Sequence, residues 1–243
     1  MPGPRRRSAL IALLTREPGA APQAAILDEL RRALLEGGVP PGTAIPLDEV
    51  AAVFGVSRIP VREALKTLIG EGLVEHRTNA GYTVAKLTPA ELAEMYLVRE
   101  ALETAALAAA LPAAGPADDD AARAAHEALE AAIAAGDVTA HHRESRRFHF
   151  ALVSPCGMHR LLKMFESAWN ITEPVRPMAH IAPGDRSVLH DDHADMLAAF
   201  VARDAEALLS AARAHHSRLA SLLGAVPQHT GLLAERGPGE IYD

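Results

Sequence analysis

Three cationic side chains at regular spacing are the first feature of this sequence that could do chemistry. Arg58, Arg62 and Lys66 recur every four residues, so on a helix they share one face. Apolar residues recur on the opposite face: Val61, Leu65 and Leu68. A helix divided in this way can pack one face in a core and present the other to the major groove of DNA. The alternative for such a triple by itself is a solvated cationic surface.

Histidines are the second feature, because neutral imidazole is a ligand for Zn²⁺ and Ni²⁺. Eleven of the 12 histidines lie in residues 87–243, whereas the single cysteine, Cys156, gives no metal-binding or redox pair and no internal disulfide. Any metal site must therefore rest on imidazoles. For a lone histidine on a helix, a core or surface position is the commoner explanation.

The composition limits the protein classes that could carry these groups. The chain has 243 residues, is 49% hydrophobic and only 4% aromatic, and is rich in alanine, which favours helical bundles. No run of 18 apolar residues occurs, so we expect no membrane span, and the single cysteine favours a reducing, cytoplasmic location. The net charge of −7 divides into +2 over residues 1–86 and −9 over residues 87–243, which indicates two modules.

Glycine and proline mark the ends of helices and strands, and their positions predict the elements of the first module, residues 21–87. Residues 1–20 contain a short apolar run that mimics a signal peptide, and we expect a flexible tail there. Three helices follow in QAAILDELRRALLEGG, LDEVAAVFG and the segment that Ser57 caps, with VPPGTAIP as a turn-rich connector. LVEHR and YTVAK flank a turn and predict a two-stranded hairpin.

This order of elements is that of a winged helix-turn-helix, and the sequence resembles the DNA-binding domain of the GntR family of bacterial regulators. The resemblance rests on about 60 residues that include Pro41-Gly42, GVSR, PVREAL, GxGLV and Gly81. It implies that Arg58 and Arg62 read base edges in double-stranded DNA, that Ser57 and Lys66 contact phosphates, and that Gly81 lets the wing approach the minor groove. Asp48 departs from many relatives, which carry a basic or polar residue there, so we assign it no DNA contact.

The second module, residues 88–223, is expected to be an all-α antiparallel bundle. The sequence TPAE at residue 88 is a capping box with proline, and Asp185 and Asp204 are predicted N-caps. Helices are predicted over 88–111, 118–135, 138–153, 158–172, 185–201 and 204–223, with a tail over 224–243. The fold class is therefore mainly α.

Three segments of this module, ESRRFHFAL, HDDHADMLAAFVARDAEALLSAARAHH and MYLVREALETAALAA, resemble the FCD domain of FadR-type GntR regulators. Members of this group sense a small molecule, and many bind a divalent metal through Asp-x₃-His and two later histidines. The resemblance places the histidines at His149, His193 and His215. Ser145 stands where the Asp is expected, and Met158 where an Asn is common.

These departures leave alternatives open. His141 or His142 could supply a ligand one turn before Ser145, whereas Glu144 points about 100° away from it. The pocket could also be metal-free, with the histidines donating hydrogen bonds to the effector. Arg99 matches an arginine common in FCD domains and could hold a carboxylate effector, or pair with Glu103 one turn on. Four further histidines are given surface or rim positions: His180, His190, His216 and His229.

The sequence thus predicts a homodimeric, ligand-responsive DNA-binding repressor that reads an inverted repeat and senses an organic acid, possible cofactors being Zn²⁺ or Ni²⁺. A catalytic zinc site is the competing class, but we expect no enzyme because no general base or nucleophile motif accompanies the histidines. A third interpretation is a structural or vestigial metal site, with Ser145 marking the lost ligand.

Overall fold

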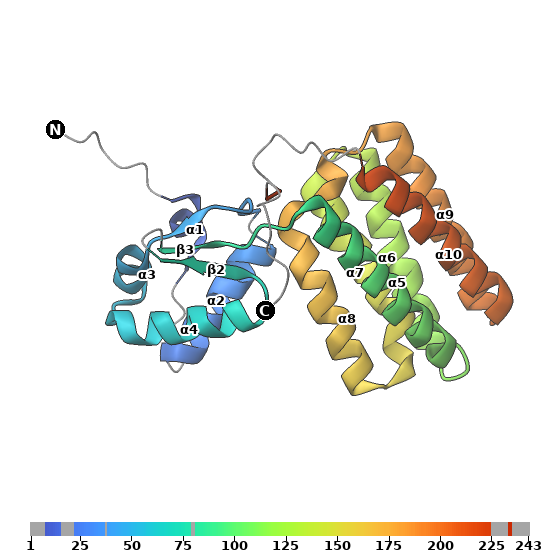
Figure 1. Cartoon of the computed structure of the whole chain (residues 1–243). Coiled ribbons are helices and arrows are strands. Elements are labelled where there is room, and N and C mark those ends of the chain that lie inside the picture. The colour runs from blue at the N-terminus through green and yellow to red at the C-terminus, as the bar shows by residue number, and fades with distance from the viewer. Residues whose placement is uncertain (1–7, 16–21, 37, 79–80, 225–232, 235–243) are drawn as a thin grey trace. The chain divides into compact units, whose positions relative to one another are not determined.

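Helices packed on a small sheet form the N-terminal unit in the computed structural model, which describes residues 8–15, 22–36, 38–78, 81–224 and 233–234. Its main helices are α2 (Pro22–Leu35), α3 (Leu47–Phe54) and α4 (Arg58–Gly70), drawn in blue to teal in Figure 1. Strands β1 (Ala44–Ile45), β2 (Val74–Arg77) and β3 (Gly81–Val84) pair antiparallel in the order β1-β3-β2. The fold is the expected winged helix-turn-helix.

The turn between α3 and α4 sets the direction of the cationic helix. Gly55 ends α3 with a left-handed φ of 65°, a conformation that glycine adopts without the strain of a side chain. Ser57 then occupies the N-cap position of α4, although its side chain makes no capping hydrogen bond. Val61, Leu65 and Leu68 are each fully buried, so the predicted apolar face of α4 lies in the core.

Two segments of this unit differ from expectation. Part of the predicted tail forms helix α1 (Ala9–Leu13), whose Leu10 is fully buried in the core shared with α2 and α3. Removing these apolar side chains from water lowers the free energy of the folded chain, so this short run packs on the core. The predicted connector contains β1, because Ala44 and Ile45 pair with Thr83 and Tyr82 of β3.

The C-terminal tail also differs at the residues that the structure describes. Leu233 is 4% exposed and the Ala234 amide donates a hydrogen bond to the Leu87 carbonyl at 2.9 Å. These contacts hold the chain at this point, contrary to the predicted loose tail. The remaining positions of both tails, residues 1–7, 16–20, 225–232 and 235–243, lie outside the described residues.

Six long helices make up the C-terminal part and confirm the mainly α fold class. They are α5 (Pro89–Ala110), α6 (Pro116–Ala134), α7 (Val138–Val153), α8 (His159–Thr172), α9 (Pro183–Ala202) and α10 (Ala205–Leu223). Short 3-10 turns lie at Ser154–Cys156, Glu173–Val175 and Pro177–Ala179. By contacts, the described residues of 90–169 and 176–224 form one compact unit, and those of 8–89, 170–175 and 233–234 the other.

Local signals explain where these helices begin. Asp204 caps α10 as predicted, with its carboxylate accepting from the Ala207 amide at 2.9 Å, and Asp137 caps α7 in the same way. Asp185 is not an N-cap, because α9 already begins at Pro183, a residue that suits a first helical turn. None of the described helices combines the length and apolarity needed to cross a bilayer.

Small and aromatic side chains fill the bundle core. Alanines on facing helices, among them Ala106, Ala122, Ala125 and Ala212, are at most 1% exposed and allow the backbones to approach closely. Phe148, Phe165 and Phe200 fill the wider spaces. Contacts are densest between α6 and α7 and between α9 and α10, and α6 also packs on α9. The polar side chains described next are embedded in this apolar packing.

Candidate functional site

The solvent-facing side of α4 carries the predicted DNA-reading residues. Ser57, Arg58, Arg62 and Lys66 are all exposed, and Ile59 between them is 71% exposed. Gly81 begins β3 with a φ of 85°, so a side chain there would be strained even though the surrounding space is open. The structure therefore leaves each of these predicted residues accessible to a partner.

Arg58 is held by an acidic residue of the preceding helix. Its Nη2 donates to Oδ2 of Asp48 at 2.8 Å, and its Nε contacts Oδ1, which makes the pair bidentate. The two side chains are 63% and 67% exposed, so water screens their attraction. Asp48, to which we assigned no DNA contact, is thus in direct contact with the first arginine of the exposed face of α4.

The three histidines predicted from the FCD resemblance meet inside the bundle. His149 of α7, His193 of α9 and His215 of α10 are 2%, 3% and 3% exposed. One ring nitrogen from each lies within 4.8 Å of the others, and the Nε2 atoms of His149 and His193 are 3.2 Å apart. Neither His141 nor His142 belongs to this group, although both are buried. Ser145 is half-buried one turn before His149.

Glu103 orients the cluster. This fully buried carboxylate of α5 lies 2.5 Å from Nδ1 of His149 and 2.9 Å from Nε2 of His216. Burial opposes ionisation, but the charges and hydrogen bonds of His149 and His216 hold the pKa of Glu103 well below its ordinary value. An ionised carboxylate only accepts, so Nδ1 of His149 donates to Glu103, and Nε2 of the same ring faces His193.

These contacts change one assignment. Glu103 makes short contacts with His149 and His216, and Arg99 lies against the rings of Trp169 and Tyr96. His216, for which we predicted a surface or rim position, is 4% exposed and belongs to the network. It was missed because it follows His215 directly and so lies on a different helix face. Of the other histidines in that group, His229 lies outside the described residues.

His193 and His215, the other two histidines of the cluster, are neutral at neutral pH. Burial lowers the pKa of His193 well below its ordinary value, and burial lowers that of His215 to about 4 despite the opposing effect of Asp192. Nδ1 of His215 is 3.7 Å from Oδ2 of Asp192, too long for a hydrogen bond, and Arg218 donates to that carboxylate at 2.9 Å. Their imidazole lone pairs are therefore available at neutral pH.

This arrangement fits a divalent transition metal. Two nitrogens bonded to one tetrahedral Zn²⁺ at about 2.0–2.1 Å lie about 3.3 Å apart, close to the 3.2 Å between the Nε2 atoms of His149 and His193. Nδ1 of His193 and of His215 are buried and make no hydrogen bond in the structure. The carboxylate behind His149 is the kind of outer partner that fixes the tautomer of a metal-binding histidine.

The ring of Trp169 lies next to Arg99 and next to His149 of the histidine cluster. The Arg99 guanidinium is 3.6 Å from the Trp169 ring centre and 4.6 Å from that of Tyr96, and Arg99 is 4% exposed. The Trp169 ring is in turn 5.2 Å from that of His149. Arg99 and the histidines are thus brought into one buried neighbourhood, as the effector assignment requires.

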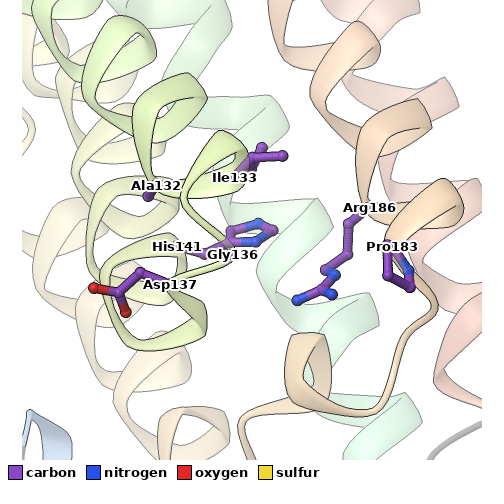
Figure 2. Close-up of a pocket in the computed structure, with 7 residues that line it drawn as sticks. All are labelled: Ala132, Ile133, Gly136, Asp137, His141, Pro183 and Arg186. Atoms are coloured by element: carbon purple, nitrogen blue, oxygen red, sulfur yellow. The ribbon is translucent and has the colours of Figure 1, made fainter.

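A pocket of about 40 Å³ opens between the ends of α6, α7 and α9 (Figure 2). Its walls are formed by seven residues: Ala132, Ile133, Gly136, Asp137, His141, Pro183 and Arg186. Figure 2 shows His141 projecting from α7 toward Arg186 of α9. Burial, and then the Arg186 charge, lower the pKa of His141 to about 4. The predicted effector residues do not line this pocket, so it is separate from the histidine cluster.

Two family models match this chain. Residues 22–84 match the model described as bacterial regulatory proteins, gntR family, and residues 94–218 match the FCD domain, more than half of the chain. The sequence is 30% identical over 188 residues to a Paenarthrobacter nicotinovorans protein named "Probable D-xylose utilization operon transcriptional repressor", covering 75% of this chain and 80% of that one.

Two further comparisons are more limited in what they show. An HTH-type transcriptional regulator of Streptomyces ambofaciens is 44% identical over 85 residues, which is 35% of this chain and only 36% of that relative. The solved structure of Escherichia coli McbR/YncC has a TM-score of 0.75, covers 85% of this chain and 98% of its own, and is 24% identical, so this likeness shows the fold.

His142 gives a prediction for the pH dependence of stability. Burial, then the neighbouring charges of His141 and Arg176, lower its pKa to about 3, whereas an unfolded histidine titrates near 6.5. Between these values the unfolded state binds the extra proton, so stability falls as pH falls, by up to about 1.4 kcal/mol per pH unit. We expect His142→Gln to flatten this dependence below pH 6.5 in urea unfolding followed by Trp169 fluorescence with a chelator present. An unchanged slope would contradict a buried, neutral His142.

Proposed function

The chain belongs to the GntR family of bacterial regulatory proteins and carries an FCD domain, and from this we propose that it is a repressor that releases its operator when an organic acid binds. As a member of that family it is a transcriptional regulator and not an enzyme, so the catalytic zinc site considered from the sequence is set aside. The DNA-binding part and the effector-binding part are the two modules that the charge division indicates.

The observation that carries the proposal is the division of α4 into a buried apolar face and an exposed cationic one. Arg58 and Arg62 lie in its first half, where a recognition helix meets base edges, and each would contact a guanine bidentately. Ser57 and Lys66 would contact phosphates, and the backbone at Gly81 would follow the minor groove. We place the protein in the cytoplasm, where it would meet its operator.

Arg62→Ala and Arg58→Ala are expected to weaken binding to the operator by about 1–3 kcal/mol each, because each would remove a bidentate base contact. Fluorescence anisotropy with the chain's own promoter and with a scrambled duplex, at two salt concentrations, measures both affinity and preference. Arg123→Ala removes an exposed arginine of α6 and should leave both unchanged. Equal preference for the promoter in the wild type and the Arg62→Ala variant would refute the base-reading role.

The bundle supplies the sensor in this proposal. His149, His193 and His215 would hold Zn²⁺ or Ni²⁺, and a bound divalent ion would supply a Lewis-acidic position for an effector carboxylate. Arg99, stacked on Trp169 beside His149, would neutralise the same carboxylate. Effector binding would then change the affinity for DNA through a coupling free energy of about 1–3 kcal/mol.

Zn²⁺ is expected to raise the melting temperature of the wild-type chain, because a ligand that binds only the folded state stabilises it. His149→Ala should abolish most of that rise, and His159→Ala, which removes an exposed histidine, should preserve it. Ser145→Asp supplies the carboxylate that relatives carry and should increase the rise. Absence of bound metal after growth with Zn²⁺ and Ni²⁺ would instead favour a metal-free pocket, in which the histidines donate hydrogen bonds to the acid.

A homodimer is the assembly that an inverted repeat requires, since each winged domain reads one half-site. One face of α5 supports this part of the proposal: Ala93, Leu97, Ala101 and Ala105 follow one another every four residues and are all exposed. Leu97 is 65% exposed and Val98 beside it 37%. An apolar face of small residues and one leucine suits close packing against the same helix of a second copy.

Leu97→Asp should convert the dimer to monomer, because it would bury an unpaired charge in the contact. Light scattering after size exclusion measures the mass. Val188→Asp places the same charge at a 38% exposed position of α9 and should leave the dimer intact. A dimer that persists in the Leu97→Asp variant at micromolar concentration would place the interface elsewhere.

A further inference from the structure

A second group of metal-ligating side chains lies outside the cluster described above. His126 and Glu130 are one turn apart on α6, and His190 lies on α9, which packs against α6. One ligand atom from each of the three residues lies within 4.8 Å of the others. Both histidines are half-buried, whereas Glu130 is exposed. The group therefore has two half-buried imidazoles and opens to solvent at the carboxylate.

The two imidazoles carry polar atoms that the protein does not satisfy. Their rings stack with centres 4.4 Å apart and planes 18° apart. Nε2 of His126 and Nδ1 of His190 are buried and have no hydrogen-bond partner in the structure. Burial lowers the pKa of both histidines, so neither is charged at neutral pH and each ring has a lone pair to donate. A buried polar atom without a partner is costly, which calls for a ligand.

We propose that His126, Glu130 and His190 bind a second divalent transition-metal ion, separate from the one assigned to the buried histidines. Two nitrogens and one carboxylate oxygen are a donor set that suits Zn²⁺ or Ni²⁺, with water completing the coordination. One ion would satisfy an unpartnered nitrogen of each ring and neutralise Glu130, once the two rings turn out of their stacked arrangement so that both lone pairs point to it. Alkaline-earth ions are disfavoured, because they prefer a shell of oxygens.

The two sites would share helix α9 but differ in access. His190 and His193 are three residues apart on that helix, with ring centres 6.2 Å apart, and each turns to a different group. The buried site has three ligands that are 2–3% exposed, whereas the second site has an exposed carboxylate that must lose side-chain freedom on binding. We therefore expect the second site to be weaker and to exchange its ion faster.

Calorimetric titration of the full-length, metal-stripped chain with Zn²⁺ alone tests this assignment. The wild type should bind two equivalents per chain, one tight and one weaker. Glu130→Gln and His190→Asn should each weaken the second equivalent by about tenfold or more and keep the first. Glu127→Gln removes a neighbouring exposed carboxylate of α6 and should change neither. His149→Ala should remove the tight equivalent and keep the weaker one.

The outcomes separate this site from the sensor proposed above. A single equivalent in the wild type that His149→Ala removes would overturn the second site and leave the sensor intact. A second equivalent that survives both Glu130→Gln and His190→Asn would also overturn it. A weak equivalent that disappears in those variants supports it even if the buried histidines bind no ion. Far-UV circular dichroism of each variant checks that the bundle is folded, and Glu130→Gln, at an exposed position, should keep it so.

Discussion

The buried carboxylate of Glu103 is the constraint on which the C-terminal bundle depends. An ionised group with no exposed surface costs several kcal/mol unless it is paired and hydrogen-bonded. His149 and His216 provide that compensation from α7 and α10, so one residue of α5 ties three helices together. Because its hydrogen bond fixes the orientation of the His149 ring, the same contact that stabilises the packing also turns Nε2 of that ring toward His193. Structure and site chemistry have a common origin here.

The electrostatics of the cluster follow from this arrangement. Two carboxylates, Glu103 and Asp192, lie behind the imidazoles, while burial keeps His193 and His215 neutral. A divalent cation placed among the three rings would meet lone pairs and, beyond them, negative charge, both of which favour it. Glu103 and Arg99 lie on one continuous helix that begins at Pro89, five residues after β3 ends at Val84. Only a short connection thus joins the wing to the helix that carries Arg99 and Glu103.

The sequence predicted the long elements well, because helical periodicity over 14 to 22 residues is a strong local signal. It could not predict α1 or β1, since five and two residues show no measurable period and their stability comes from Leu10 in the core and from pairing with β3. The positions of the three clustered histidines were predicted from the resemblance to the FCD domain. The roles of Glu103 and His216 were not, because local spacing suggested only Arg99 as a partner of Glu103, whereas the histidines that contact Glu103 are 46 and 113 residues away.

The contact between Asp48 and Arg58 bears on the DNA recognition that we propose. With both side chains more than 60% exposed, the pair is worth about 0.2–1 kcal/mol, less than the 1–3 kcal/mol of a bidentate guanine contact. In the proposed complex a correct base would therefore draw Arg58 away from Asp48, whereas a phosphate alone would compete less well and would also meet the repulsion of the carboxylate. Asp48 would then disfavour non-specific binding more than specific binding, so its departure from the family pattern would sharpen sequence preference rather than reduce affinity uniformly.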